Sequence, residues 1–164
     1  PIINAPLELP NGGVGVPYFQ SLTAILGTPP YTFTAISGAL PPGLNLSTSG
    51  TISGTPTSAG NFSFTIQVSD SNGKSSQRSL VQTVNKANTT TVVASSANPS
   101  VYGQSVTFTA TVTVNPPGAG TPGGTVQFKI DGADFGSPVT LSGGSATSGA
   151  TSALTAGPHR ERSL

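Results

Sequence analysis

The residues 61–70, NFSFTIQVSD, alternate strictly between apolar and polar side chains, and this period of two restricts what the chain can fold into. The apolar members share one face of an extended strand: Phe62, Phe64, Ile66 and Val68. A strand of this kind buries one face and leaves the other in water. The Asn72-Gly73 pair that follows suits the positive φ of a tight turn. We therefore predict that 74–84 returns as the second strand of a hairpin.

Proline and glycine punctuate the short apolar runs throughout the sequence. The stretch 40–56, LPPGLNLSTSGTISGTP, holds three prolines and three glycines and no charge. Proline cannot donate to a strand ladder, so Pro41-Pro42 predicts a corner. Residues that favour helices never gather at a period of 3.6, which argues against long helices. These features predict an all-β fold of sheets stacked face to face, in which proline and glycine let the connections change layer quickly.

The composition excludes several classes of function. Only 7% of the residues are charged and the formal net charge is +1, so no strong field attracts nucleic acid or an anionic membrane. The absence of cysteine excludes disulfides, cysteine-ligated zinc and cysteine nucleophiles. No apolar run approaches the roughly 18 residues that a membrane-spanning helix needs. The opening PIINAPLELP lacks the basic start and apolar core of a signal peptide. Either a precursor was processed or the chain is a fragment of a longer protein, and we expect the fragment.

Strand patterns cover both halves of the chain. In the first half, further strands are predicted over about 16–25, 30–37 and 51–53. In the second half, strands are predicted over 89–94, 106–114, 126–130, 135–141 and 145–153. The segment between the halves, NKAN (85–88), is a short linker.

The last eight residues, GPHRERSL (157–164), hold three of the eleven ionised residues and show no alternation. They are predicted to form a polar tail. The chain is therefore divided into one domain over 1–86 and a second over 87–164. The second domain has about five predicted strands where seven are common in such sandwiches, so we expect it to be incomplete.

Several ordered motifs of the first half carry a family resemblance. They are LPNGGVGVPYFQSLTA, GTPPYTFT, GALPPGLNLS, SGTISGTPTSAGNFSFTIQVSD and NGKSSQ. Together they resemble the putative Ig (He-PIG, cadherin-like) repeats of bacterial surface and secreted proteins, over residues 5–84. One departure is Ile25-Leu26, which places apolar surface where the family more often has small polar residues.

Residues 89–157 resemble a different bacterial Ig-like repeat, through TTTVVASSANPSVYGQSVTFTATV, GGTVQFKIDGADFG and TSALTAG. In that family two further strands normally follow the TAG segment, whereas this chain continues with a charged segment. The resemblance implies two tandem Ig-like β-sandwiches, the second lacking its last strands. It further implies extracellular, repeated modules that act as spacers or adhesive stalks, with no shared catalytic residues.

The scarce ionisable residues give few candidates for catalysis. His159 is the only histidine and lies in the charged segment, with no positioned partner for acid–base chemistry. Asp131 and Asp134 are close in sequence, but a DGAD turn places them at a hairpin tip, where turn formation explains both. We predict no catalytic and no cofactor-binding residues.

Calcium is the one metal for which the sequence offers candidates, because cadherin-like modules often bind it at their junctions. Glu8 and Asp70 could converge on an ion, although calcium prefers six to eight oxygens with several carboxylates among them. The linker over 85–88 adds amides and a lysine but no acid. The alternative is that both carboxylates are unrelated surface acids.

We expect a non-enzymatic extracellular spacer or adhesive-stalk module of a bacterial surface or secreted protein. The alternative is a carbohydrate- or ligand-binding accessory module of a secreted enzyme, with Tyr18, Tyr31 and Tyr102 as the candidate aromatic platform. Packing is the favoured role for these rings, because Tyr18 and Tyr31 lie on predicted inward faces. The expected partners are other Ig-like modules of the same or identical chains, without nucleic acid or membrane insertion. A homo-oligomer or filament could form if the stretch 1–10 completed the second domain of another copy by strand addition.

Overall fold

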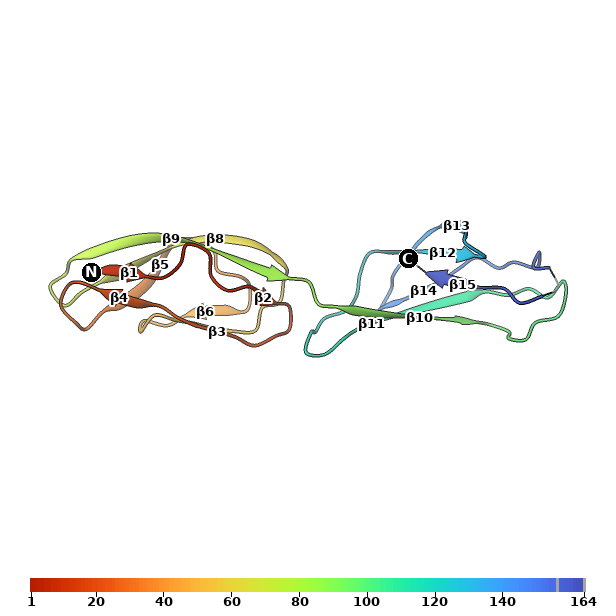
Figure 1. Ribbon diagram of the computed structural model, residues 1–164, viewed down its shortest axis with the longest axis horizontal. Helices are drawn as coiled ribbons and strands as arrows, with labels where there is room; N and C mark the ends of the chain where they lie inside the picture. The colour runs from red at the N-terminus through yellow and green to blue at the C-terminus, as the bar shows by residue number, and fades with distance from the viewer. Residues whose placement is uncertain (156, 164) are drawn as a thin grey trace. The chain divides into compact units, whose positions relative to one another are not determined.

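The computed structural model describes residues 1–155 and 157–163, and of residues 161–163 it describes the main chain only. The described residues form strands, turns and loops without a helix, which confirms the all-β prediction (Figure 1). Two compact units are present. Unit 1 comprises Pro1–Ala87 with Pro116–Gly120, and unit 2 comprises Asn88–Asn115 with Thr121–Leu164.

Unit 1 contains nine strands: β1 (Ile2–Asn4), β2 (Gly12–Gly13), β3 (Tyr18–Ser21), β4 (Thr23–Ile25), β5 (Thr32–Gly38), β6 (Leu44–Leu46), β7 (Thr51–Gly54), β8 (Gly60–Ser69) and β9 (Ser75–Asn85). They form a four-stranded sheet of order β2-β9-β8-β5, a three-stranded sheet of order β3-β7-β6, and the pair β1-β4. The predicted hairpin is β8–β9, which pairs antiparallel without a break from Gly60↔Val84 to Ser69↔Ser75.

The core of unit 1 follows from the alternation in β8 and β9. Ile66, Val68 and Leu80 point inward and are fully buried, and Ile52 of β7 meets them from the other sheet. Each such side chain stabilises the folded state by about 1.5–3 kcal/mol relative to an exposed position. The period-two pattern therefore sets which face of the hairpin forms the core.

The single strand predicted over about 16–25 is wrong in one respect, because it is two strands in different sheets. β3 pairs with β7, whereas β4 pairs with β1. Leu22 separates them and is 2% exposed, and its amide donates to the carbonyl of Gly50. The buried side chain and the hydrogen bond to Gly50 hold Leu22 in place where the chain passes from one sheet to the other.

The 40–56 stretch contains β6 and β7, and its main chain passes close to itself where Gly43 meets Gly54 and Thr55. Gly43 has φ 91°, and a Cβ on it would lie 2.0 Å from the carbonyl oxygen of Thr55. Gly54 has φ 138°, and its Cβ would lie 2.1 Å from the carbonyl oxygen of Gly43. The main chains pass so closely here that only glycine fits. The glycines of this stretch are therefore required by the crossing itself.

Unit 2 contains six strands in the described residues: β10 (Thr89–Ser95), β11 (Phe108–Val114), β12 (Thr125–Ile130), β13 (Ala133–Thr140), β14 (Ser145–Thr147) and β15 (Glu161–Ser163). Two three-stranded sheets result, of order β10-β11-β14 and β13-β12-β15. The inward residues Val106, Phe108, Val126 and Phe128 form the buried core. The rings of Phe108 and Phe135 meet edge to face with centroids 6.2 Å apart, a favoured aromatic geometry.

The prediction of a polar tail over 157–164 is wrong for residues 161–163, which form β15. This strand pairs antiparallel with β12, in the register Ile130↔Glu161 to Phe128↔Ser163. β15 pairs with the edge of β12 through main-chain hydrogen bonds. Such bonds do not require alternating side chains, which explains why the sequence pattern did not predict this strand. Leu164, the last residue of the expected tail, lies outside the described residues.

We predict that Gly43→Ala destabilises unit 1 by roughly 2–5 kcal/mol, the sum of backbone strain and overpacking. The matched control is Gly73→Ala, because Gly73 has φ 73° but faces open space. That control should cost only the strain, roughly 1–2 kcal/mol. Calorimetric unfolding of the whole chain measures both, and equal losses would contradict the crowding at Gly43.

Candidate functional site

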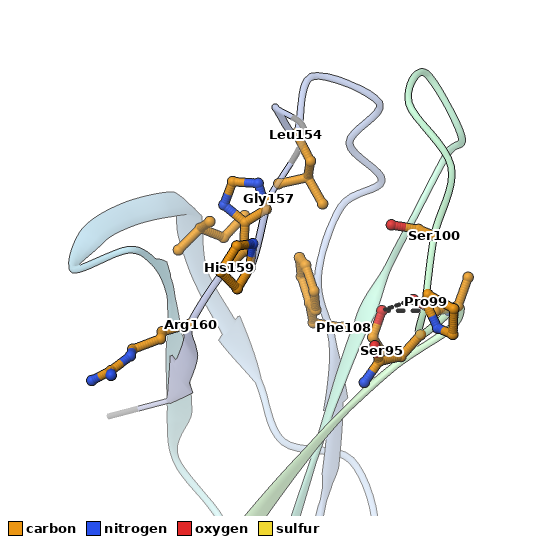
Figure 2. Close-up of a pocket in the computed structure, with 12 residues that line it drawn as sticks. Ser95, Pro99, Ser100, Phe108, Leu154, Gly157, His159 and Arg160 are labelled. Carbon is orange, nitrogen blue, oxygen red and sulfur yellow. Dashed lines mark hydrogen bonds between the residues drawn. The ribbon is translucent and has the colours of Figure 1, made fainter.

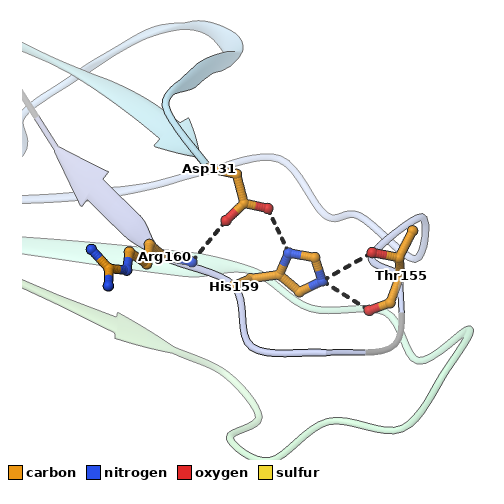
Figure 3. Close-up of polar contacts among 4 residues, drawn as sticks. All are labelled: Asp131, Thr155, His159 and Arg160. Carbon is orange, nitrogen blue, oxygen red and sulfur yellow. Dashed lines mark hydrogen bonds and ion pairs between the residues drawn. The ribbon is translucent and has the colours of Figure 1, made fainter.

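Asp131 and His159 meet at the turn between β12 and β13, although sequence analysis treated them separately (Figure 3). The imidazole Nδ1 lies 2.6 Å from Asp131 Oδ2, and the amide of Arg160 donates to Asp131 Oδ1 at 2.9 Å. The Asp131 amide in turn donates to the carbonyl of Arg160 at 3.0 Å. We call this set the Asp131–His159 clasp, and it fixes the residue just before β15.

The electrostatics of the clasp favour a charged imidazole. The hydrogen bond to Asp131 raises the pKa of His159, and the bond to the Thr155 carbonyl raises it further. The Arg160 amide lowers the pKa of Asp131, with His159 as the next cause. The side chains are 22% exposed for His159 and 52% for Asp131, so solvent screens the pair in part.

An Asp–His pair beside a hydroxyl has the outline of a catalytic triad, yet this geometry opposes that role. The imidazole Nε2 lies 2.8 Å from the Thr155 carbonyl oxygen and 3.5 Å from its Oγ1. Both ring nitrogens face acceptors, so the doubly protonated ring satisfies both contacts, and in that form it has no lone pair to take a proton from a nucleophile. The clasp is therefore suited to structure rather than to general-base catalysis.

A cavity of about 360 Å³ lies beside the clasp, at the end of unit 2 where the 95–100 segment faces Leu154 and residues 157–160. Figure 2 shows Phe108, Leu154 and His159 turned toward it, with Pro99 on the facing wall and the Arg160 side chain directed away. The Ser95 hydroxyl on its wall already donates to the Ala97 carbonyl at 2.8 Å. The cavity reaches only the lower end of the size range of small-molecule sites.

The three tyrosines have different environments. Tyr18 and Tyr31 are partly buried and pack against the core of unit 1, as predicted from their inward positions. Burial raises the pKa of Tyr18, whose hydroxyl donates to the Pro10 carbonyl at 3.0 Å. Tyr102 is 84% exposed on the loop between β10 and β11, so packing does not explain it. Phe19, which sequence analysis did not single out, is 72% exposed on β3.

Asp70, a predicted calcium candidate, uses its carboxylate to accept main-chain hydrogen bonds in the β8–β9 turn. It is 7% exposed and accepts main-chain hydrogen bonds from Asn72 and Lys74 at 3.0 Å and from Thr28 at 3.3 Å. Desolvation raises the pKa of Asp70, but the three N–H donors outweigh it and hold the pKa below its usual value. These donors already compensate the carboxylate charge.

Glu8, the second calcium candidate, does not converge with Asp70. Glu8 forms a parallel bridge with Val81, whereas Asp70 bonds Lys74 at the start of β9. Lys74 and Val81 are seven positions apart, which corresponds to roughly 23 Å along the strand. In the described part of the chain, no three acidic or histidine side chains gather closely enough to hold a metal ion.

The remaining predicted acid, Asp134, forms an ion pair with Lys129 at 2.5 Å across β12 and β13. Its side chain is 63% exposed, in agreement with the expected place near a hairpin tip. The prediction for Asp131 was incomplete, because its turn position also faces the segment that precedes β15. The one usable signal was the family resemblance, which expects a strand after the TAG segment.

Comparison with known families agrees with this architecture. Residues 1–85 match the family described as putative Ig domain, and residues 91–160 match the family described as bacterial Ig-like domain (group 3). The chain belongs to the putative Ig domain family. The two matches in tandem confirm the resemblance that the sequence motifs indicated, and with it the prediction of two Ig-like sandwiches.

Solved structures give more distant similarities. A putative alpha-galactosidase from Bacteroides fragilis is 28% identical, with a TM-score of 0.43, over 51% of this chain and 17% of that one. The eight N-terminal Ig domains of Down Syndrome Cell Adhesion Molecule align at 15% identity and a TM-score of 0.42, over 96% of this chain and 26% of that one. The chain thus spans less than a fifth of the galactosidase.

A third structure contains the fibronectin(III)-like modules of CbhA from Clostridium thermocellum. It aligns at 18% identity and a TM-score of 0.36, over 89% of this chain and 76% of that one. Among curated proteins no sequence matches the chain.

We predict that Asp70→Asn lowers the Tm of unit 1 near pH 7, because the variant loses the charge that three N–H donors stabilise. An acid with a lowered pKa stabilises the fold above its unfolded value and ceases to do so as pH falls through its folded value. The difference from wild type should therefore shrink as the pH falls below about 3.9, the ordinary pKa of an aspartate. Scanning calorimetry measures it, with Glu8→Gln as the exposed control.

The same measurement tests calcium. Millimolar calcium should leave the Tm of wild type and of Asp70→Asn unchanged. A calcium-dependent rise that Asp70→Asn abolishes would overturn the assignment of Asp70 to the turn.

Proposed function

We propose that the chain is a non-enzymatic spacer or adhesive-stalk module of a bacterial surface or secreted protein, located outside the cell. Ig-like domain families are structural or adhesive modules and are generally not catalytic, and this chain contains two such domains in tandem. None of the described residues belongs to a helix suited to crossing a membrane. The observation that carries the proposal is the main-chain geometry at the two ends of unit 1.

The ends of unit 1 lie at opposite ends of its long strands. Pro1 lies beside Gly27 and Asp70, next to the turn between β8 and β9. β9 then runs 11 residues away from that turn to Asn85, roughly 36 Å. A force applied between Pro1 and Asn85 therefore acts along the strands rather than across them.

The first and last segments of unit 1 also run side by side in parallel. The Val81 amide donates to the Leu7 carbonyl and the Leu9 amide donates to the Val81 carbonyl, both at 2.9 Å. The parallel pairing continues from Gly12↔Val84 through β2, and the Val14 amide donates to Asn85 at 3.0 Å. Pulling the ends apart slides these two segments in opposite directions. The bonds are then loaded together, not one at a time.

A buried side chain reinforces this terminal pairing. Gln82 of β9 is completely buried, and its amide nitrogen donates to the Pro10 carbonyl at 2.8 Å. The same carbonyl accepts the hydroxyl of Tyr18, which belongs to the opposite sheet. Leu9 inserts beside them and is 4% exposed. The segment is thus held by main-chain bonds, a side-chain bond and core packing.

We predict that Val81→Pro lowers the force at which unit 1 unfolds in single-molecule pulling of the whole chain. Proline removes the amide that bonds Leu7, while amides of alternate residues in β9 bond β8 and stay intact. Because the chain lacks cysteine, engineered terminal cysteines give unambiguous attachment.

The control is Gln77→Pro on the same strand. By alternation its amide points to the same side as that of Val81, and in the described residues no main-chain bond outside the strand ladders uses it. Gln77→Pro should leave the unfolding force close to wild type. If both variants lowered the unfolding force equally, the result would contradict the proposal that the terminal pairing resists the applied force.

The expected partners remain other Ig-like modules of the same or identical chains. The stretch 1–10, proposed from the sequence as a strand donor, is already used within unit 1. Ile3 and Leu9 are buried in its core, and β1 pairs with β4. Donation of this stretch to another copy would therefore require part of unit 1 to unfold.

A second candidate function is binding of a carbohydrate, which the exposure of Tyr102 favours. An aromatic ring that is 84% exposed on a loop offers a face on which a sugar can stack. Beside it lies a cavity of about 190 Å³ that Ser100, Gln104 and Thr155 also line, so hydroxyl and amide groups border the ring.

We predict that, if this second function holds, a glycan array detects a ligand whose binding Tyr102→Ala abolishes. Phe19→Ala serves as the control, because it removes a comparably exposed ring from unit 1. An array without a ligand, or equal losses in both variants, would remove the carbohydrate hypothesis and leave the spacer proposal intact.

A further inference from the structure

β15 lies at the edge of its sheet in unit 2. The strand has three residues, and in the described part of the chain its ladder partner is β12. Immediately before it, Asp131 and Arg160 exchange two hydrogen bonds, one through each main-chain amide. The third link is the 2.6 Å contact between the carboxylate and the His159 ring. The Asp131–His159 clasp is thus the anchor at the beginning of β15.

Among the side chains that the structure describes, Asp131 is the only charged partner of His159. The 95–100 segment and the residues Phe108, Ile130 and Leu154 that line the adjoining cavity carry no titratable side chain. Arg160 is exposed and directed away from the cavity (Figure 2). The charges of Lys129 and Asp134 on the neighbouring strands are paired with each other. Loss of the imidazole proton therefore removes an attraction that no other described side chain replaces.

We propose that the Asp131–His159 clasp is a pH-dependent latch that holds β15 against β12. With the imidazole charged, Asp131 binds both the ring and the Arg160 amide. With the imidazole neutral, one ring nitrogen loses its proton, and either Asp131 or the Thr155 carbonyl faces a lone pair. The segment from 157 to β15 then loses part of its anchor.

The direction of the pH dependence follows from two protonation equilibria, that of the His159 imidazole and that of the Asp131 carboxylate. A histidine whose pKa is raised by folding contributes stability below about pH 6.5, and the contribution is lost as pH rises through the folded pKa. An aspartate whose pKa is lowered contributes above about pH 3.9 and loses the contribution as pH falls through its folded pKa. The latch is therefore strongest between about pH 4 and pH 6.5 and weakens at alkaline pH.

Release of the latch has a structural consequence. The His159 ring forms part of the wall of the 360 Å³ cavity, so its departure widens that cavity. It also frees the β12 edge at Phe128, Lys129 and Ile130. Such an edge can accept another strand, so release exposes an interaction surface that the closed state covers.

The test uses the whole chain and its single histidine, which gives one unambiguous imidazole titration by NMR. We expect the pKa of His159 to be raised in wild type and to return toward its ordinary value in Asp131→Asn. Asparagine tolerates the φ of 51° at this position and keeps an acceptor for the Arg160 amide, so the variant removes mainly the charge. The control is Asp134→Asn, which should leave the titration unchanged.

The second readout is hydrogen exchange of the Asp131 amide, which donates to Arg160. Its protection factor should be constant between about pH 5 and 6 and then fall as pH rises to about 8. The fall should approach tenfold for each unit by which folding raises the pKa of His159. This measurement needs only wild-type protein, so it decides the question even if a variant fails to fold.

Two results would overturn the latch. One is an identical His159 titration in wild type and Asp131→Asn. The other is a protection factor at Asp131 that does not change across this pH range. An equal effect of Asp134→Asn on either readout would assign the pH dependence to general electrostatics instead of the clasp.

Discussion

The antiparallel ladder of the β8–β9 hairpin is the interaction on which unit 1 depends. Its inward face supplies the fully buried Ile66, Val68 and Leu80, and its far edge holds the N-terminal segment in parallel. Because one strand serves both tasks, the packing that stabilises the sandwich also fixes the segment that would carry load. We therefore expect core stability and resistance to pulling to be coupled through β9.

Charged residues are scarce in this chain, and two of its acids have specific structural roles. The Asp70 carboxylate accepts main-chain hydrogen bonds in the β8–β9 turn, and the Asp131 carboxylate accepts one from the residue before β15. Both act through main-chain N–H groups, which solvate a carboxylate without a metal or a second carboxylate. The acids that suggested calcium or catalysis from the sequence are better explained as parts of turns and strand attachments.

The strands with strong alternation were predictable, because burial of one face leaves a local signal. The hairpin over 61–84 and the alternating residues of β11 and β12 belong to this class. Leu22 and residues 161–163 do not, since the first changes layer within a short apolar run and the second form a strand from charged residues. Their structure depends on partners distant in sequence, which local patterns do not report.

By itself, the sequence determined that this chain forms strands, which faces are apolar and where turns must occur. Period two, proline and glycine act within a few residues, so they can be read directly. Only the tertiary structure decided that the segment from Leu7 to Val14 runs parallel to β9 and that Asp131 meets His159. Those contacts join residues tens of positions apart, and their geometry exists only after the sheets have paired.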